Sequence, residues 1–207
     1  MYICNSQFVI YVSKSEKTKA FIIETVAPIF NKNGYSAMSL SKITKATGLT
    51  KGAIYGNFEN KEQLAIAVFQ FSVRRILKDL NTHVNQGKTP LEQLFNVSTF
   101  YKNYYEYNIK LGGCPILNTG VDANNHNPQI IAKVRSYNER ILDRFTNLIE
   151  SCKASKEIKN TVDSELYAKR FFAMIEGAIY MSYIMEDKNY MKDLAVYMKQ
   201  IIQNELI

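Results

Sequence analysis

The 207-residue sequence is poor in the residues that build disulfide frameworks and metal sites. It contains three cysteines, Cys4, Cys114 and Cys152, with no CxxC pair, and two histidines, His83 and His126. An odd number of widely spaced cysteines does not indicate a disulfide framework, and so few Cys and His side chains do not indicate a zinc site. We therefore expect no metal and a chain that works in the reducing cytoplasm.

Long apolar runs and strand patterns are also missing. The longest apolar run, Phe171 to Met185, is 15 residues long and contains Glu176, so it is too short and too interrupted to span a bilayer. The apolar opening segment has neither a basic leader nor a small-residue cleavage site, so we do not interpret it as a signal peptide. Since no strand run or Gly-rich repeat competes with helical periodicity, we expect an all-α protein.

The residue constellations of an enzyme are absent as well. The sequence has no Ser, Cys or His constellation, no carboxylate pair at metal-binding helical spacing and no phosphate-binding glycine loop. Glu176 is an isolated acid in an apolar helix, which we interpret as a satisfied core or pocket residue. A helical-bundle enzyme therefore has little support, and we expect no cofactor.

Positive charge is what the first third of the chain has in excess. Residues 1–61 hold eight lysines and three glutamates, a net +5 of the formal +7 of the whole chain. This asymmetry favours a polyanionic partner for the N-terminal part, although a basic solvated face without a partner shows the same pattern.

Helical periodicity dominates after residue 13, and most of the expected helices begin with recognisable start signals. Ser13 and Glu16 form a capping box, and Gly34 supplies the left-handed conformation of a C-terminal cap. The chain is long enough for a DNA-reading head at residues 13–60 and a larger helical body at residues 61–207. We expect about nine helices, at residues 13–33, 40–47, 51–57, 61–85, 90–110, 116–123, 128–152, 163–186 and 190–205.

The first dozen residues stand apart from this pattern, because the first capping box begins only at Ser13. We treat residues 1–12 as a possible extension. Our hypothesis is that residues 1–11 are a non-native upstream extension and that Val12 marks an alternative start codon.

The most informative segment runs from Ser39 to Phe58. A short helix, a turn at Gly48-Leu49 and a second short helix capped by Thr50 predict a helix-turn-helix. The second helix would leave small and polar side chains on its outer face, where a lysine or an asparagine can contact bases or phosphate and a tyrosine hydroxyl can contact phosphate. These outward residues are Lys51, Gly52, Ala53, Tyr55 and Asn57.

The motif Thr50-Lys51-Gly52-Ala53-Ile54-Tyr55-Gly56-Asn57-Phe58, followed by Lys61-Glu62-Gln63-Leu64, resembles the TetR family of bacterial regulators. The resemblance implies an N-terminal three-helix DNA-binding head followed by a C-terminal bundle that binds an effector and dimerises. It also implies that Ser41 and Lys61 join the outward residues on the DNA-facing side. The complete candidate set is Ser39, Ser41, Thr50, Lys51, Gly52, Ala53, Tyr55, Asn57 and Lys61.

The helix expected at residues 163–186 is apolar on more than one side, so it needs a cover on two faces. A second copy of the chain is the simplest cover, although a central helix buried within a monomer remains the alternative. The resemblance to TetR-like proteins agrees with a dimer formed through the last two helices. The expected interface residues are Phe172, Ile179, Tyr183, Leu194, Met198 and Ile201.

Tyrosines are frequent in the body, and their apolar rings with hydroxyl tips suit a pocket for a small aromatic or amphipathic effector. A plain core with surface tyrosines is the alternative for any single residue. Cys114 is either an oxidation or electrophile sensor or a buried small apolar residue. The expected pocket residues are Phe100, Tyr104, Tyr107, Cys114, Leu117, Tyr137, Phe171 and Ile175.

These patterns together predict a homodimeric DNA-binding transcriptional regulator with a small-molecule effector. We expect a repressor that leaves a pseudo-palindromic operator in double-stranded DNA when the effector binds, although activation would use the same parts. The alternative is an architectural or chromosome-organising DNA-binding protein that needs no effector.

Overall fold

The computed structural model describes residues 13–124 and 127–207, and within these ranges its regular structure is entirely helical. Our hypothesis about residues 1–11 and Val12 lies outside the described residues. In the described part of the chain, ten α-helices are followed by a π-helical turn, η1. Their bounds are α1 Lys14–Asn33, α2 Leu40–Thr47, α3 Lys51–Tyr55, α4 Lys61–Val84, α5 Pro90–Lys102, α6 Tyr105–Leu111, α7 Pro115–Ala123, α8 Pro128–Ala154, α9 Ser164–Ile184, α10 Asn189–Ile201 and η1 Ile202–Leu206.

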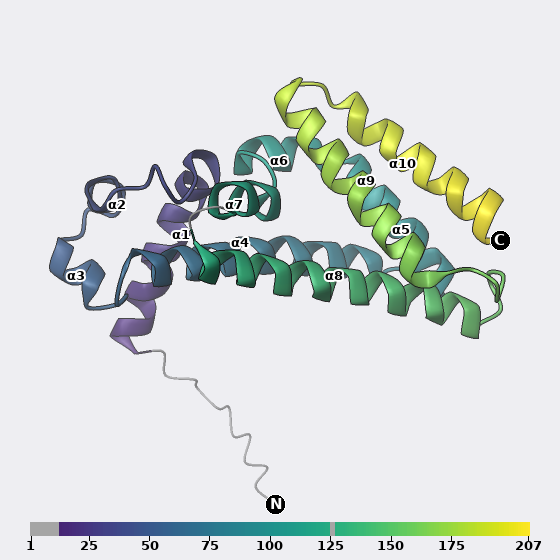
Figure 1. The fold of residues 1–207 in the computed structure, drawn as a ribbon, viewed down its shortest axis with the longest axis horizontal. Coiled ribbons are helices and arrows are strands. Elements are labelled where there is room, and N and C mark those ends of the chain that lie inside the picture. Colours follow the sequence, from purple (N-terminus) through teal and green to yellow (C-terminus); the bar gives the residue numbers. More distant parts are fainter. Residues whose placement is uncertain (1–12, 125–126) are drawn as a thin grey trace, which may run out of the picture.

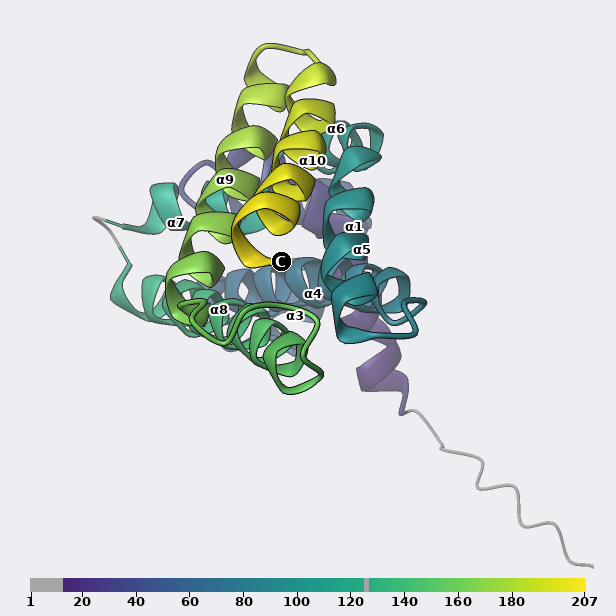
Figure 2. The same cartoon turned by 90° about the vertical axis from the view of Figure 1, so that its right-hand side faces the viewer.

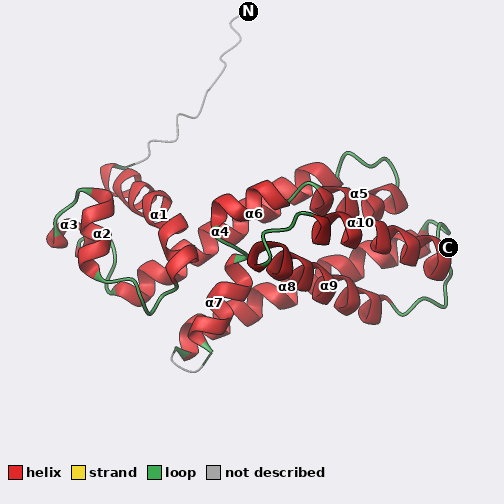
Figure 3. Ribbon diagram, turned by 90° about the horizontal axis from the view of Figure 1, so that it is seen from above, coloured by secondary structure: helices red, strands yellow, loops and turns green. Residues whose placement is uncertain are grey.

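Helices α1, α2 and α3 form a head at one end of the molecule (Figures 1 and 3). The expected capping box at the start of α1 is confirmed, because the Glu16 backbone N–H donates to Ser13 Oγ and the Ser13 backbone N–H donates to Glu16 Oε2. The head has its own apolar cluster, which extends past residue 60 into α4. Its buried members are Ile22, Val26, Ala27, Phe30, Met38, Ile43, Ile54, Phe58, Leu64, Ala65, Val68, Ala123 and Ile130.

Helix α4 belongs to both parts of the molecule. Leu64, Ala65 and Val68 complete the head cluster, whereas Leu80 lies in the body core. Its 24 residues span about 36 Å. The boundary expected after residue 60 therefore cuts through the head core, because periodicity alone does not reveal that one helix serves two cores.

The body is formed by α4 to α10. Helices α4 and α8 run lengthwise, and α5, α9 and α10 lie across them (Figures 1 and 2). The single helix expected at residues 90–110 is two helices, since the chain breaks at Asn103-Tyr104. This break lets α5 pack on α4 and α10 while α6 packs on α9 and α1.

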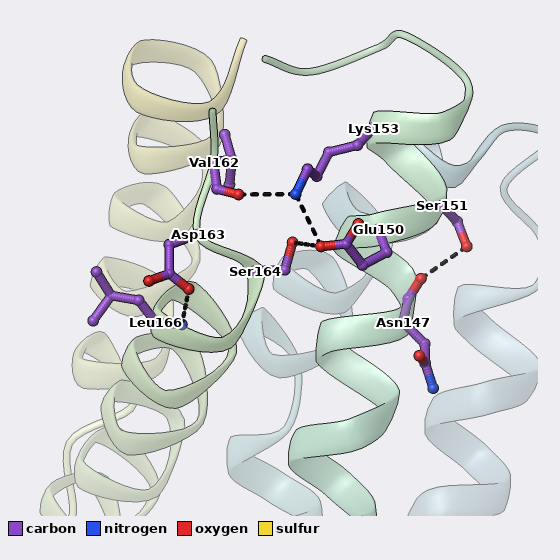
Figure 4. Close-up of polar contacts among 8 residues, drawn as sticks. All are labelled: Asn147, Glu150, Ser151, Lys153, Val162, Asp163, Ser164 and Leu166. Atoms are coloured by element: carbon purple, nitrogen blue, oxygen red, sulfur yellow. Dashed lines mark hydrogen bonds and ion pairs between the residues drawn. The ribbon is translucent and has the colours of Figure 1, made fainter. Parts of the chain in front are cut away.

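Polar contacts fix the connection between α8 and α9 (Figure 4). Lys153 Nζ lies 2.9 Å from Glu150 Oε1 and donates to the Val162 carbonyl oxygen over 3.1 Å. Ser164 Oγ also donates to Glu150 Oε1, and Asp163 caps the start of α9. These contacts hold the two helices at their far end, away from the head.

No helix among the described residues is both long enough and apolar enough to cross a bilayer.

Candidate nucleic-acid interface and ligand cleft

The helix-turn-helix is set by caps at both of its short helices. Ser39 Oγ accepts the backbone N–H of Lys42 at the start of α2, and Thr50 Oγ1 accepts that of Ala53 at the start of α3. Gly48 ends α2 with φ +69°, in the left-handed region that favours glycine. The Thr50 hydroxyl acts as an acceptor in its cap, so its hydrogen stays free to reach a phosphate oxygen.

The helix faces divide as the motif predicts. Ile43, Ile54 and Phe58 are buried in the head cluster. Lys51, Gly52 and Tyr55 are exposed, and the Tyr55 side chain is 52% accessible at the tip of the head. The ring and the hydroxyl of Tyr55 are therefore accessible to a partner on this surface.

The other expected DNA-facing residues differ in their exposure and in their hydrogen bonds within the head. Ser39 and Ser41 are exposed and Ala53 is half-buried. Asn57 is held inside the head, because its Nδ2 donates to the Ala53 carbonyl over 2.8 Å and its Oδ1 accepts from Ser15 Oγ over 3.3 Å. The structure therefore gives Asn57 one hydrogen bond to α3 and one to α1, and sequence spacing did not reveal the contact with α1.

Lys61 is half-buried at the base of the head. Its Nζ lies 4.3 Å from the centroid of the Tyr35 ring, and burial lowers the pKa of its ammonium group. This cation–π contact anchors the start of α4 to the loop after α1.

Three of the expected pocket residues, Phe100, Tyr104 and Tyr107, line a small cavity of about 200 Å³. The other expected residues do not join them. Phe171 and Ile175 are fully buried core side chains, and Tyr137 faces α4, where its hydroxyl oxygen accepts from Arg74 Nε. The expected pocket is thus partly core, because tyrosine content does not separate packing from ligand binding.

A larger cleft of about 750 Å³ lies between the end of α1, the α6–α7 turn, α7 and α9. Of the expected pocket residues, only Leu117 lines it. No local sequence pattern predicts this cleft, since its walls come from segments far apart in the chain. The lining residues are Asn31, Lys32, Asn33, Gly34, Gly112, Leu117, Asn118, Val121, Asp122, Glu176, Gly177, Tyr180 and Tyr183.

Glu176 is the unusual group of this cleft. Burial raises the pKa of its carboxyl to about 7. Its Oε1 accepts from Cys114 Sγ over 3.4 Å, whereas its Oε2 is buried with no hydrogen-bond partner. We expected a satisfied core or pocket residue. Glu176 does line a cleft, but its Oε2 atom is not satisfied.

Cys114 itself is buried. Desolvation and the neighbouring Glu176 raise the pKa of its thiol well above its ordinary value, so the thiol stays protonated and donates to the carboxyl. Thiolates are the reactive form of cysteine. A thiol that stays protonated therefore favours the hypothesis that Cys114 is a buried packing residue over the hypothesis that it is a sensor.

The expected dimer interface needs a correction. Ile179, Leu194, Met198 and Ile201 are buried within the single chain, in the core that α9 and α10 share with α5. Phe172 and Tyr183 are half-buried. The apolar stripe of α10 is thus used for packing inside the chain, which periodicity cannot tell from an interface.

A different face of α9 and α10 is exposed and apolar. On α9 one row of exposed residues recurs at alternating intervals of four and three, from Leu166 to Ile184, and it is apolar except for the charged Arg170. On α10, Val196 and Tyr197 lie outward, each 55% accessible. The exposed face consists of Leu166, Ala173, Gly177, Tyr180, Ile184, Val196 and Tyr197.

The family model described as "Bacterial regulatory proteins, tetR family" matches residues 22–68, and that described as "Tetracyclin repressor-like, C-terminal domain" matches residues 90–198. The crystal structure of a TetR-family transcriptional regulator from Cytophaga hutchinsonii is similar, with a TM-score of 0.89 and 32% identity over 95% of this chain and 98% of that chain.

Two curated proteins are also similar. The "Fatty acid metabolism regulator protein" of Bacillus subtilis (strain 168) is 22% identical over 182 residues, which are 88% of this chain and 90% of that protein. The "Probable acrEF/envCD operon repressor" of Escherichia coli (strain K12) is 37% identical over 82 residues, which are 38% of this chain and 36% of that protein.

The two family matches cover the helix-turn-helix head and most of the body, and the second alone covers more than half of the chain. The resemblance to the TetR family, inferred from the Thr50–Phe58 motif, is thereby confirmed for the head and for the body. This chain belongs to the TetR family of bacterial transcriptional regulators, and not to a family of enzymes.

Proposed function

We propose that the chain is a homodimeric repressor whose two heads bind a pseudo-palindromic operator and leave it when a small effector binds the body. The observation that carries this proposal is the exposed tip of the head. Lys51, Gly52 and Tyr55 lie outward there beside the Thr50 cap. A similar protein is named an operon repressor, and the relatives named above are regulators, so an effector-independent architectural role is not favoured.

The head suits a major groove in shape and charge. Small residues at positions 52 and 53 allow a close approach of α3, Lys51 supplies a charge for phosphate or a guanine edge, and Tyr55 supplies a hydroxyl for phosphate. Ser39, Ser41 and the free hydroxyl hydrogen of Thr50 would add phosphate contacts at the helix starts. We assign Asn57 and Lys61 to the support of this surface, because both are engaged inside the head.

Dimerisation would use the exposed face of α9 and α10. Ala173 and Gly177 leave room for a close helix approach, and Leu166, Ile184 and Tyr197 would be covered by the same face of a second copy. A two-fold axis through these helices pairs the two heads on one side of the dimer, as a palindromic operator requires.

Effector binding would act through the joint between head and body. Residues Asn31 to Gly34 at the end of α1 form one wall of the 750 Å³ cleft, and Gly177 and Tyr180, which also belong to the proposed dimer face, form another. A ligand in this cleft would touch the head and lie next to the partner subunit, so it could change the spacing of the two heads.

The test is footprinting of the purified dimer on the DNA flanking its own gene, followed by titration of the protected site. Lys51→Ala should weaken binding and lower the slope of log K against log salt by about 0.9 if the lysine contacts phosphate. Lys88→Ala is the matched control, since Lys88 is an exposed lysine in the α4–α5 loop of the body. Unchanged affinity in Lys51→Ala, or an equal loss in both variants, would refute the assignment of the head surface.

A further inference from the structure

The cleft between α1, α7 and α9 has a chemical character that points to a class of ligand. We propose that it binds an organic cation, a protonated amine on an apolar or aromatic body, whose ammonium group pairs with the Glu176 carboxyl. This inference deepens the proposed function and rests on it for the step from ligand binding to operator release.

The Glu176 carboxyl is an incomplete site. Its Oε2 is buried without a hydrogen-bond partner, and its Oε1 has only the weak S–H donor of Cys114. A buried acceptor left without a donor costs folding free energy, and natural proteins leave few such atoms. A ligand that brings a charged N–H group to this carboxyl would satisfy the missing hydrogen bond.

Other groups near Glu176 also favour a ligand that donates hydrogen bonds. On the adjoining turn of α9, the Ile179 carbonyl accepts from Asn108 Nδ2, while Asn108 Oδ1 is buried with no partner. Asp122 adds a second carboxylate to the cleft wall, and Lys32 is the one cationic side chain among the described residues that line it. An anionic ligand would meet two acids and one base, so the balance of charge favours a cation.

The cleft also offers aromatic and apolar surface for the uncharged part of such a ligand. Tyr180 and Tyr183 bring two aromatic rings to the cleft, and aromatic faces attract cations as well as apolar groups. Leu117 and Val121 add apolar area from α7. A volume of about 750 Å³ is within the range of drug-sized sites, so the cleft accommodates more than an ammonium ion.

The experiment measures binding by isothermal titration calorimetry on the full-length protein without DNA. The probes are 4-phenylbutylamine, 4-phenylbutan-1-ol and 4-phenylbutanoate, which share one apolar body and differ in charge. The amine should bind at least about tenfold more tightly than the alcohol, since a charge-assisted hydrogen bond is worth that much, and the carboxylate should bind most weakly.

The variant Glu176→Gln should lower amine affinity by about tenfold while alcohol affinity changes less than about twofold. Glu165→Gln is the matched control, an exposed acid on the same helix outside the cleft. Equal binding of the three probes, no amine binding, or unchanged amine affinity in Glu176→Gln would overturn the proposal. The probe comparison on the unaltered chain stays decisive if Glu176→Gln fails to fold.

Operator release is measured separately, by adding the amine to the footprinted complex. Amine binding without release would support the cation site and contradict the effector step of the proposed function. Operator release by another compound, without amine binding, would support the effector step and contradict the cation site.

Discussion

Asn118 of α7 donates from its Nδ2 atom to the backbone carbonyl of Asn31, in the last turn of α1, over 3.0 Å. The Asn31 side chain also binds the body. Its Nδ2 donates to the Leu111 carbonyl over 2.6 Å and to the Gly113 carbonyl over 2.8 Å. Two asparagines thus join the end of the first head helix to the α6–α7 turn. Gly112 lies so close to α1 that an added Cβ would stand 3.0 Å from the Lys32 Cβ atom.

We expect Asn31→Leu to loosen this joint. The substitution keeps the branching and the number of side-chain heavy atoms but leaves two carbonyl oxygens without their donor, which should lower the free energy of unfolding by about 1–3 kcal/mol. Urea denaturation followed by circular dichroism measures the change. Asn33→Leu, at an exposed asparagine of the same turn, should stay within about 0.5 kcal/mol of the parent chain. An equally small change in Asn31→Leu would show that the joint is held by other contacts.

Tyr55→Phe tests the tip of the head with the smallest possible change. If the hydroxyl contacts phosphate, its loss should weaken operator binding by about 0.5–1.5 kcal/mol, and equally for all operator sequences. Fluorescence anisotropy with several half-site variants measures this. Because the ring is exposed and outside the head core, thermal unfolding should not change. A loss confined to one base position would instead assign Tyr55 to base reading.

Ile184→Glu tests the exposed face of α9 and α10. A charge placed within an apolar interface remains buried and unpaired, so the dimer should dissociate into folded monomers. Analytical ultracentrifugation at micromolar protein concentration measures the mass. Phe21→Glu is the control, since Phe21 is a comparably exposed apolar residue on α1, remote from this face. A dimer that survives Ile184→Glu would place the interface elsewhere.

The Glu176 carboxyl predicts a dependence of stability on pH. Burial raises its pKa to about 7 in the folded chain, against 4.5 in the absence of burial, so between these values the folded state holds a proton that the unfolded state has released. The stability contribution of this group is therefore full below pH 4.5 and is lost as the pH rises through 7. At pH 8 we expect Glu176→Gln to be more stable than the parent chain by on the order of 2 kcal/mol, and near pH 4 the two should agree.

The same titration should govern amine binding. The charged groups that line the cleft together with Glu176 are Lys32 and Asp122, and the neighbouring Cys114, Tyr101 and Tyr104 have raised pKa values and stay neutral. If the amine pairs with the carboxylate, its affinity should rise about tenfold from pH 6 to pH 8 and then level off. Calorimetry between pH 6 and pH 8 measures the amine affinity. An affinity independent of pH would show that the amine does not pair with Glu176.

The sequence was sufficient for most of the fold because its signals are local. The capping residues Ser13, Ser39, Thr50 and Thr89 each begin a helix at the expected place, and the motif around Gly48 predicted the turn of the head. The break at Asn103-Tyr104 was missed, because no proline or glycine marks it. Local chemistry fixes where helices begin better than it fixes where they bend.

The candidate sites were predictable only where one segment builds them. The outward residues of α3 follow from a single motif, whereas the cleft has walls on α1, α7 and α9. The interface prediction failed at Met198 because a stripe that packs on α5 has the same period as one that packs on a second copy. Likewise, nothing in the spacing of Asn57 shows that its amide is held by Ser15, 42 positions away.

Because Leu64, Ala65 and Val68 complete the head cluster from within α4, the head has no core that ends where its third helix ends. A fragment cut after residue 60 would lose these side chains and should collapse into a loose, aggregation-prone state. Heating the intact chain should melt both clusters in a single cooperative transition, since neither can lose α4 without the other.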